Sequence, residues 1–368
     1  MSGVECQVKV MQEAPNDEVL IRHEGRAGRI TLNRPQALNA LTLGMVREIW
    51  TAMIAWKDDA DVELVLLDGA GDRALCAGGD VRWLYESRAK GSADARAFWS
   101  EEYRLNALIA RYPKPYVAFM HGIVMGGGIG LAAHGRHRIV TEKSQLAMPE
   151  TSIALIPDVG GTWLLSRAPA ETGVYLGLTG ERMRGAGTIF AGFADTFVPS
   201  ARLGELAQAL TSATGADVDT VIRDHAGQPP ASELAQRSET IQHAFRFDTV
   251  EEIVSELEKM DGDWARTRLA ELATKSPLSL KLTLAAIRNA RKLRSLEEAL
   301  NIEYRLCVRL FEHGEFIEGV RALIVDKDRK PKWRPPRIED VSPDLVAEWL
   351  APLPDGQELG LAPPAETN

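Results

Sequence analysis

Hydrophobic and polar positions along the first 200 residues form short apolar runs separated by amphipathic stretches. Runs of five to eight residues that read as strands occupy 18–25, 29–33, 62–69, 115–122 and 137–141. The first two are joined by a glycine-containing turn, which predicts a hairpin. Helical spacing lies between the later strands, around 43–56, 97–111 and 128–134. Strands that alternate with helices predict a parallel sheet with helical crossovers.

Beyond about residue 200, helical periodicity continues without a further strand pattern. Ser276-Pro277 is a typical N-cap and first-turn pair, and Ser295 with Glu298 forms a capping box. From Pro331 onward the chain holds eight of its 19 prolines, which predicts a tail that wraps the surface or is partly disordered. We therefore predict three parts: a core over 1–200, a helical region over 201–330 that completes the fold, and a proline-rich tail over 331–368.

Charge and cysteine content narrow the class of protein. A net charge of −9 argues against nucleic-acid binding, which normally requires a basic excess. Cys6, Cys76 and Cys307 are too widely spaced for a disulfide framework or a metal site. The N-terminus lacks the basic and apolar regions of a signal peptide, so we predict a cytoplasmic location. Residues 115–135 approach the length of a membrane span, but six glycines interrupt them and favour a buried strand, turn and helix.

Three segments carry the candidate chemistry. CAGGDV (76–81) and MGGGIGLAAH (125–134) each follow a predicted strand, and their glycines let backbone N–H groups face a ligand. AMPETSIALIPDVGGTW (147–163) holds Glu150 and Asp158 in apolar surroundings, where a charge is costly unless it is paired or used. Simpler interpretations stay open, since Asp80, Glu150 and Asp158 can each accept hydrogen bonds from backbone amides as caps. The second segment also fits the glycine pattern of a dinucleotide-binding site. However, too few residues separate it from the next predicted strand to form the crossover helix that such a site normally has.

Considered together, the three segments favour acyl chemistry. Two glycine turns that each present an N–H group are the parts of an oxyanion hole, which stabilises negative charge on a carbonyl oxygen. The two carboxylates can supply acid–base or nucleophilic chemistry. An apolar pocket and mutual repulsion predict a raised pKa for one of these acids, and hence a bell-shaped pH–rate profile.

These segments resemble the crotonase (enoyl-CoA hydratase/isomerase) superfamily. Residues 33–42 read NRPQALNALT, a pattern found near the N-terminus of that family, and the two glycine loops match its oxyanion loops. The resemblance implies an α/β fold, a spiral of β-β-α units, followed here by a helical C-terminal region. It also implies an acyl-CoA substrate, with the backbone N–H groups of Gly79 and Gly127 as the oxyanion donors.

One departure from the hydratase pattern changes the expected reaction. Enoyl-CoA hydratases of this family carry two catalytic glutamates, one two residues after the G-G-G and one in a P-E motif. This chain has Gly130 at the first position and retains only the second glutamate, as Glu150. The chain is similar instead to the 3-hydroxyisobutyryl-CoA hydrolase branch, which shows MGGGxGL and then AMPETxIGxxPDVGG. That resemblance implies Glu150 and Asp158 as catalytic acids and Glu102 as a substrate contact. The implied reaction is hydrolysis of a short β-hydroxyacyl-CoA in valine catabolism.

The resemblance implies no metal or redox cofactor, because CoA is part of the substrate, and its adenine and phosphates are expected to meet the NRPQALNAL loop. Cys76, His121 and His134 are interpreted as packed residues. Two other functions stay open: enoyl-CoA hydration or isomerisation by Glu150 alone, and non-catalytic acyl-CoA binding. The sequence separates neither 3-hydroxyisobutyryl-CoA from 3-hydroxypropionyl-CoA nor a monomer from a homo-oligomer.

Overall fold

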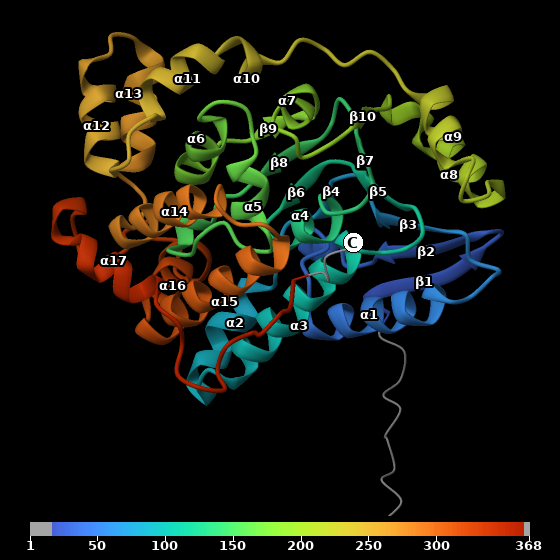
Figure 1. Ribbon diagram of the computed structural model, residues 1–368, viewed down its shortest axis with the longest axis horizontal. Coiled ribbons are helices and arrows are strands. Elements are labelled where there is room, and N and C mark those ends of the chain that lie inside the picture. The colour runs from blue at the N-terminus through green and yellow to red at the C-terminus, as the bar shows by residue number, and fades with distance from the viewer. Residues whose placement is uncertain (1–16, 364–368) are drawn as a thin grey trace, which may run out of the picture.

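The computed structural model describes residues 17–363, which form two β-sheets surrounded by helices (Figure 1). The larger sheet has the strand order β1-β2-β3-β5-β7-β10, and the smaller has the order β4-β6-β8-β9. The larger sheet consists of β1 (Val19–Glu24), β2 (Ala27–Leu32), β3 (Leu64–Gly69), β5 (Tyr116–Met120), β7 (His137–Val140) and β10 (Thr196–Phe197). The smaller consists of β4 (Ala74–Cys76), β6 (Ile123–Met125), β8 (Gln145–Ala147) and β9 (Met183–Arg184).

The larger sheet confirms the predicted hairpin and parallel strands. β1 and β2 pair antiparallel, and β2, β3, β5, β7 and β10 are parallel neighbours. Alternate residues of β3 belong to two apolar clusters, Val65 and Leu67 to one and Leu64 and Leu66 to the other. A strand covered on both faces reads as a continuous apolar run, which is the pattern of 62–69.

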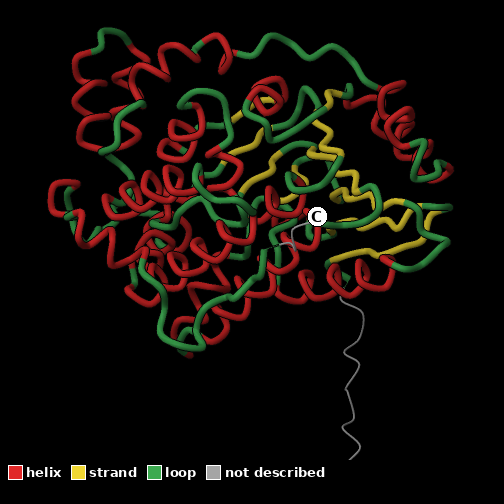
Figure 2. Tube along the Cα trace, viewed as in Figure 1, coloured by secondary structure: helices red, strands yellow, loops and turns green. Residues whose placement is uncertain are grey.

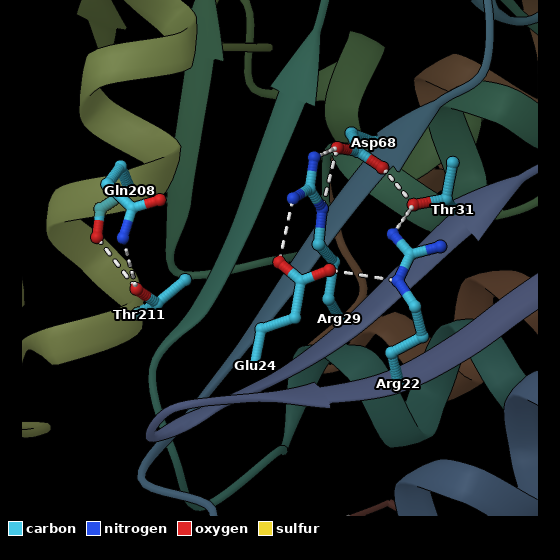
Figure 3. A network of polar contacts seen from close by, with 7 residues as sticks. All are labelled: Arg22, Glu24, Arg29, Thr31, Asp68, Gln208 and Thr211. Atoms are coloured by element: carbon cyan, nitrogen blue, oxygen red, sulfur yellow. Dashed lines mark hydrogen bonds and ion pairs between the residues drawn. The ribbon is translucent and has the colours of Figure 1, made fainter.

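Charged side chains tie the hairpin to β3 (Figure 3). Arg29 of β2 donates to Glu24 on β1 (2.8 Å) and to Asp68 on β3 (3.0 Å). Thr31 also donates to Asp68 (2.6 Å), and Arg22 donates to both Glu24 and Thr31. The hydrogen bond from Arg29 lowers the pKa of Glu24. Because these groups are partly exposed, we expect the network to fix strand register more than to add stability.

The sequence pattern does not predict the smaller sheet, because its strands are only two or three residues long. Its strands β4, β6 and β8 each follow a strand of the larger sheet, and β4 and β8 both pair in parallel with β6. A helix comes after each such pair of strands, so the chain repeats a β-β-α unit. The spiral fold implied by the family resemblance is therefore confirmed.

Helices surround both sheets (Figure 2). Up to β10 they are α1 (Leu43–Lys57), α2 (Val81–Ser87), α3 (Ala93–Ala110), α4 (Gly127–Ala132), α5 (Gly161–Ser166), α6 (Thr172–Thr179) and α7 (Gly185–Phe190). The later ones are α8 (Leu203–Ser212), α9 (Val218–His225), α10 (Glu233–Gln236), α11 (Ser238–Phe245), α12 (Val250–Lys259), α13 (Asp263–Leu272), α14 (Pro277–Ala290), α15 (Leu296–His313), α16 (Glu315–Val320) and α17 (Pro343–Leu350). The hydroxyls of Ser276 and Ser295 accept the capping hydrogen bonds of α14 and α15, as predicted, and the hydroxyl of Thr42 caps α1 in the same way.

The C-terminal region packs directly on the spiral. Helix α15 contacts α3, and α14 contacts α5 and α6. Within the described chain, no strand follows β10, as predicted. The tail up to residue 363 wraps the surface: α17 packs on α14 and α15, and Arg104 of α3 donates to the Leu359 carbonyl (2.7 Å). The three-part division of the chain stays a prediction.

The predicted absence of a signal peptide and the position of Cys6 lie outside the described residues. Residues 115–135 form β5, β6 and α4, which confirms the predicted strand and helix and places a second strand in the segment predicted as a turn. No helix in the described part of the chain has the length and apolar character needed to cross a membrane.

Candidate active site

The first glycine loop leaves β4 and is held by the NRPQALNALT segment. The N–H of Leu41 donates to the Gly78 carbonyl and the N–H of Asp80 donates to the Leu41 carbonyl, both at 2.9 Å. Gly78 has φ +114°, a conformation that favours glycine. The Asp80 carboxylate caps α2, so the simpler interpretation of that aspartate is confirmed. The N–H of Gly79, between these fixed residues, donates to no protein acceptor within residues 17–363.

The second glycine loop leaves β6 and begins α4. Gly126 turns with φ +46°, and Gly127 is the first residue of the helix, whose N–H has no partner within the helix. A Cβ placed on Gly127 would lie only 3.4 Å from the backbone nitrogen of Gly79. The two loops therefore bring two N–H groups side by side, as an oxyanion hole requires. Helix α4 is six residues long, too short for the crossover helix of a dinucleotide site.

All five site residues predicted from the sequence line one cavity of about 250 Å³. Glu150 begins a 3₁₀ helix (Glu150–Ile153) three residues after the end of β8, and Asp158 follows in the turn before α5. Glu102 enters from α3, and Gly79 and Gly127 contribute the two loops. The wall is completed by apolar side chains from several elements, among them Trp99, Phe98, Leu155, Phe316 and Leu323.

The three acids of the cavity are buried and strongly perturbed. Glu102, Glu150 and Asp158 are each 5 % exposed or less. Burial raises the pKa of Glu102 and of Glu150 well above the usual range, and the charge of Asp158 raises both further. Burial raises the pKa of Asp158 to about 6 against the opposing effect of the Tyr103 hydrogen bond. Within the described residues, Glu102 Oε1 and Glu150 Oε2 have no hydrogen-bond partner, so both are free to bind a substrate or a water.

Asp158 has two partners that the sequence analysis does not identify. The Tyr103 hydroxyl donates to Asp158 Oδ2 (2.6 Å), and the Cys307 thiol lies 3.8 Å from the same oxygen. Tyr103 directly follows Glu102 in SEEY, so it could have been suspected once Glu102 was singled out. Nothing in the sequence around Cys307 indicates this contact.

Gly130 is closely surrounded. A Cβ at this position would lie 2.7 Å from Val159 Cβ and 2.8 Å from Asn106 Nδ2. Contacts below 3.0 Å force neighbouring atoms to move, so a glutamate here would require rearrangement of the turn next to Asp158. The lack of an acid at this position is therefore built into the packing of this site.

Of the three residues interpreted as packed, Cys76 is fully buried, whereas His121 and His134 are partly buried. Burial raises the pKa of the Cys76 thiol to about 12, which keeps it protonated and unreactive at neutral pH. His134 is partly buried, with its Nε2 2.7 Å from the Val159 carbonyl, and burial lowers its pKa to about 4. The Nδ1 of His121 lies 3.3 Å from Thr141 Oγ1, outside the cavity that holds the acids.

The raised pKa of Asp158 predicts a pH-dependent stability. The folded protein keeps this proton up to about pH 6, whereas the unfolded chain loses it near the ordinary value of 3.8. The contribution of Asp158 to stability is therefore present below that ordinary value and is lost as the pH rises to about 6. Relative to the wild type, Asp158→Asn should gain about 1–3 kcal/mol between about pH 4 and about pH 7. Urea unfolding across that range measures this, and a constant difference would contradict it.

Comparisons with known proteins agree with this geometry. Residues 27–350 match the enoyl-CoA hydratase/isomerase family. A relative from Danio rerio named 3-hydroxyisobutyryl-CoA hydrolase, mitochondrial, is 40% identical over 96% of this chain and 94% of its own length. The human protein of the same name is 40% identical over 89% of this chain and 86% of its own length.

Two solved structures are also similar over nearly the whole chain. One is described as a carnitinyl-CoA dehydratase from Mycobacterium thermoresistibile; it is 46% identical, with a TM-score of 0.89, and the match covers 94% of this chain and 98% of that one. The other is described as an enoyl-CoA hydratase from Rhodobacter sphaeroides 2.4.1; it is 46% identical, with a TM-score of 0.88, and the match covers 94% of this chain and 100% of that one. The predicted family is thereby confirmed, and the chain belongs to the enoyl-CoA hydratase/isomerase family.

Proposed function

We propose that this protein hydrolyses the thioester of a short β-hydroxyacyl-CoA, with 3-hydroxyisobutyryl-CoA as the preferred substrate. The observation that carries the proposal is the cavity in which Glu150 and Asp158 lie beside two neighbouring backbone N–H groups. Carboxylates next to an oxyanion hole can transfer an acyl group to water. The name shared by the relatives from Danio rerio and human supports the same reaction and the same acyl group.

The proposed roles follow from where each group lies. The thioester oxygen accepts from the N–H groups of Gly79 and Gly127, which stabilise the charge that develops when the carbonyl is attacked. Glu150 either attacks the carbonyl carbon and forms an anhydride that water then hydrolyses, or takes a proton from the attacking water. Asp158 protonates the departing CoA thiolate or orients the water. Both routes yield the hydroxy acid and free CoA.

Glu102 is the proposed contact for the β-hydroxyl of the substrate. Its Oε1 is unpartnered within the described residues and would lie 2.5 Å from a Cβ on Gly127, next to the oxyanion donors. A carboxyl there can pair with a hydroxyl two carbons from the thioester carbonyl. A cavity of about 250 Å³ suits a short acyl group. One methyl in an apolar pocket is worth only about 1–3 kcal/mol, so 3-hydroxypropionyl-CoA should also be hydrolysed.

Hydration, dehydration or isomerisation of an acyl-CoA by Glu150 alone is the second candidate. The descriptions of the two solved structures, a carnitinyl-CoA dehydratase and an enoyl-CoA hydratase, favour it. Against it stands Gly130, where the hydratase pattern has a second glutamate and where this chain leaves no room for one. Non-catalytic acyl-CoA binding, the third candidate, offers no reason for unpartnered buried acids beside the two loops.

Thiol release distinguishes these candidates. The wild-type protein is expected to release free CoA from 3-hydroxyisobutyryl-CoA, and to leave crotonyl-CoA without thiol release or loss of its conjugated absorbance. Loss of that absorbance without thiol release would instead establish a hydratase. Binding of both substrates without turnover of either would establish an acyl-CoA-binding protein.

Several properties of the proposed enzyme remain predictions. The reaction needs no metal or redox cofactor, because CoA arrives as part of the substrate. Binding of its adenine and phosphates by the NRPQALNAL loop and a homo-oligomeric state are both untested. The predicted cytoplasmic location also stays open, and the relatives cited above are named as mitochondrial.

A further inference from the structure

The turn that carries Asp158 is held in an unfavourable conformation. Val159 has φ +53° and Gly160 has φ +79°, so two successive residues lie in the left-handed region. A β-branched residue there is strained, and such strain persists only when surrounding contacts impose it. A Cβ on Gly160 would lie 2.6 Å from the His134 ring, so the turn is also tightly enclosed.

The buried carboxyl group of a single residue accepts three hydrogen bonds from this turn. Glu303 of α15 is fully buried, and its Oε2 accepts from the Gly160 N–H (2.7 Å) while Oε1 accepts from the Thr162 N–H (2.9 Å). The Thr162 hydroxyl donates to the same Oε1. Gly160 is the N-cap of α5 and has no side chain of its own, so Glu303 caps that helix from a distant element.

The same helix also approaches the carboxylate of Asp158. Cys307 lies one turn after Glu303 on α15, which places both side chains on one face. Its Sγ lies 3.2 Å from the Tyr103 hydroxyl, the group that donates to Asp158. Helix α15 therefore contacts the backbone after Asp158 through Glu303. Through Cys307 it contacts Tyr103, the hydrogen-bond partner of the Asp158 side chain.

We propose that Glu303 is a positioning residue for the reaction: its hydrogen bonds to residues 160–162 impose the strained turn that aims Asp158 into the cavity. The inference rests on the proposed function, because it assigns Glu303 an effect on turnover through Asp158. It also gives the C-terminal helical region a part in the chemistry, since Glu303 lies more than 100 residues after β10, the last strand of the larger sheet. The burial that raises the pKa of Glu303 to about 8 is a cost that a purely apolar contact would avoid.

The test is a double-mutant cycle between Glu303→Gln and Asp158→Asn, followed by thiol release. A glutamine has one acceptor oxygen, whereas the N–H groups of Gly160 and Thr162 donate to two different oxygens of Glu303. The variant therefore loses one of these hydrogen bonds, and the turn is less well fixed. We expect Glu303→Gln to lower kcat about 10- to 100-fold with KM changed less than about twofold, as for a misplaced catalytic group. In the Asp158→Asn background the same substitution should change kcat less than about twofold, because the group that it positions is already absent.

Glu171→Gln is the matched control. Glu171 is a buried glutamate that accepts hydrogen bonds from Arg288 and Arg291 away from the cavity, so its variant should lose stability and keep kcat. If Glu303→Gln does not fold, Thr162→Val removes only the hydroxyl bond to the same carboxylate, and a smaller fall in kcat of about three- to tenfold is expected. Hydrogen exchange gives a readout apart from activity: the amides of residues 158–164 should exchange faster in Glu303→Gln than in Glu171→Gln.

Each outcome decides between the two proposals. An equal loss of kcat in both backgrounds, or an unchanged kcat in a folded variant, would overturn the role of Glu303 and leave the hydrolase proposal standing. A wild-type protein that releases no thiol would instead overturn the proposed function. In that case, faster hydrogen exchange of residues 158–164 in Glu303→Gln would show that Glu303 stabilises the turn but has no role in thioester hydrolysis. The inference about Glu303 would then be wrong as well.

Discussion

Glu150→Gln is expected to lower thiol release by at least about 10³-fold while leaving the protein at least as stable as the wild type. A glutamine side chain can neither attack the thioester nor take a proton from water, so both proposed routes stop. Stability should be kept because Oε2 of Glu150 has no partner within the described residues, and burial and the charge of Asp158 raise the pKa of this acid. A neutral amide of the same shape removes that desolvation cost.

The control variant is Glu171→Gln, which should show the opposite result in both measurements. In Glu171→Gln the arginines that face Glu171 lose a charged partner, so we expect lower stability with normal turnover. Thermal unfolding and initial rates on the two variants therefore separate a functional acid from a structural one. Normal turnover with lower stability in Glu150→Gln would mean that Glu150 is structural and would remove the centre of the proposed mechanism.

The hairpin, the larger parallel sheet and the helix caps could be predicted from local features of the sequence, whereas the family resemblance implied the spiral and the roles of the site residues. Helix caps such as Thr42 and Ser276 act within three residues, and the hairpin follows from two β runs and one turn. Gly79, Gly127 and Glu150 lie in short motifs, and the family resemblance of those motifs implies their roles. The five predicted site residues meet in one cavity because the parallel strands bring these motifs to the same side of the spiral.

What could not be predicted depends on contacts between residues far apart in the chain. Tyr103 and Asp158 are 55 residues apart, and Glu303 and Gly160 are 143 residues apart. No local pattern assigns this contact to Glu303, because its role is created by what α15 packs against. The small sheet is missed for a related reason: strands of two or three residues are defined by their partners and not by their own periodicity.

Gly127→Ala keeps the backbone N–H but is expected to hold the thioester oxygen away from it, and so to lower kcat by about 10²–10³-fold, the effect of losing one oxyanion donor. The added methyl would lie 2.5 Å from Glu102 Oε1 and 3.4 Å from the Gly79 nitrogen, and so would occupy the space that the thioester oxygen needs. Strain is not the cause, because Gly127 does not lie at positive φ.

The matched control for this substitution is Gly204→Ala in α8, where a Cβ meets no atom within 4 Å. That variant should turn over normally and gain about 0.5–1 kcal/mol of stability, because alanine loses less backbone entropy in a helix. The pair thus makes the same chemical change in the cavity and on a surface helix. If Gly127→Ala hydrolysed the thioester at the wild-type rate, the oxyanion would have to be stabilised elsewhere, and the neighbouring N–H groups of the two loops would have no part in the reaction.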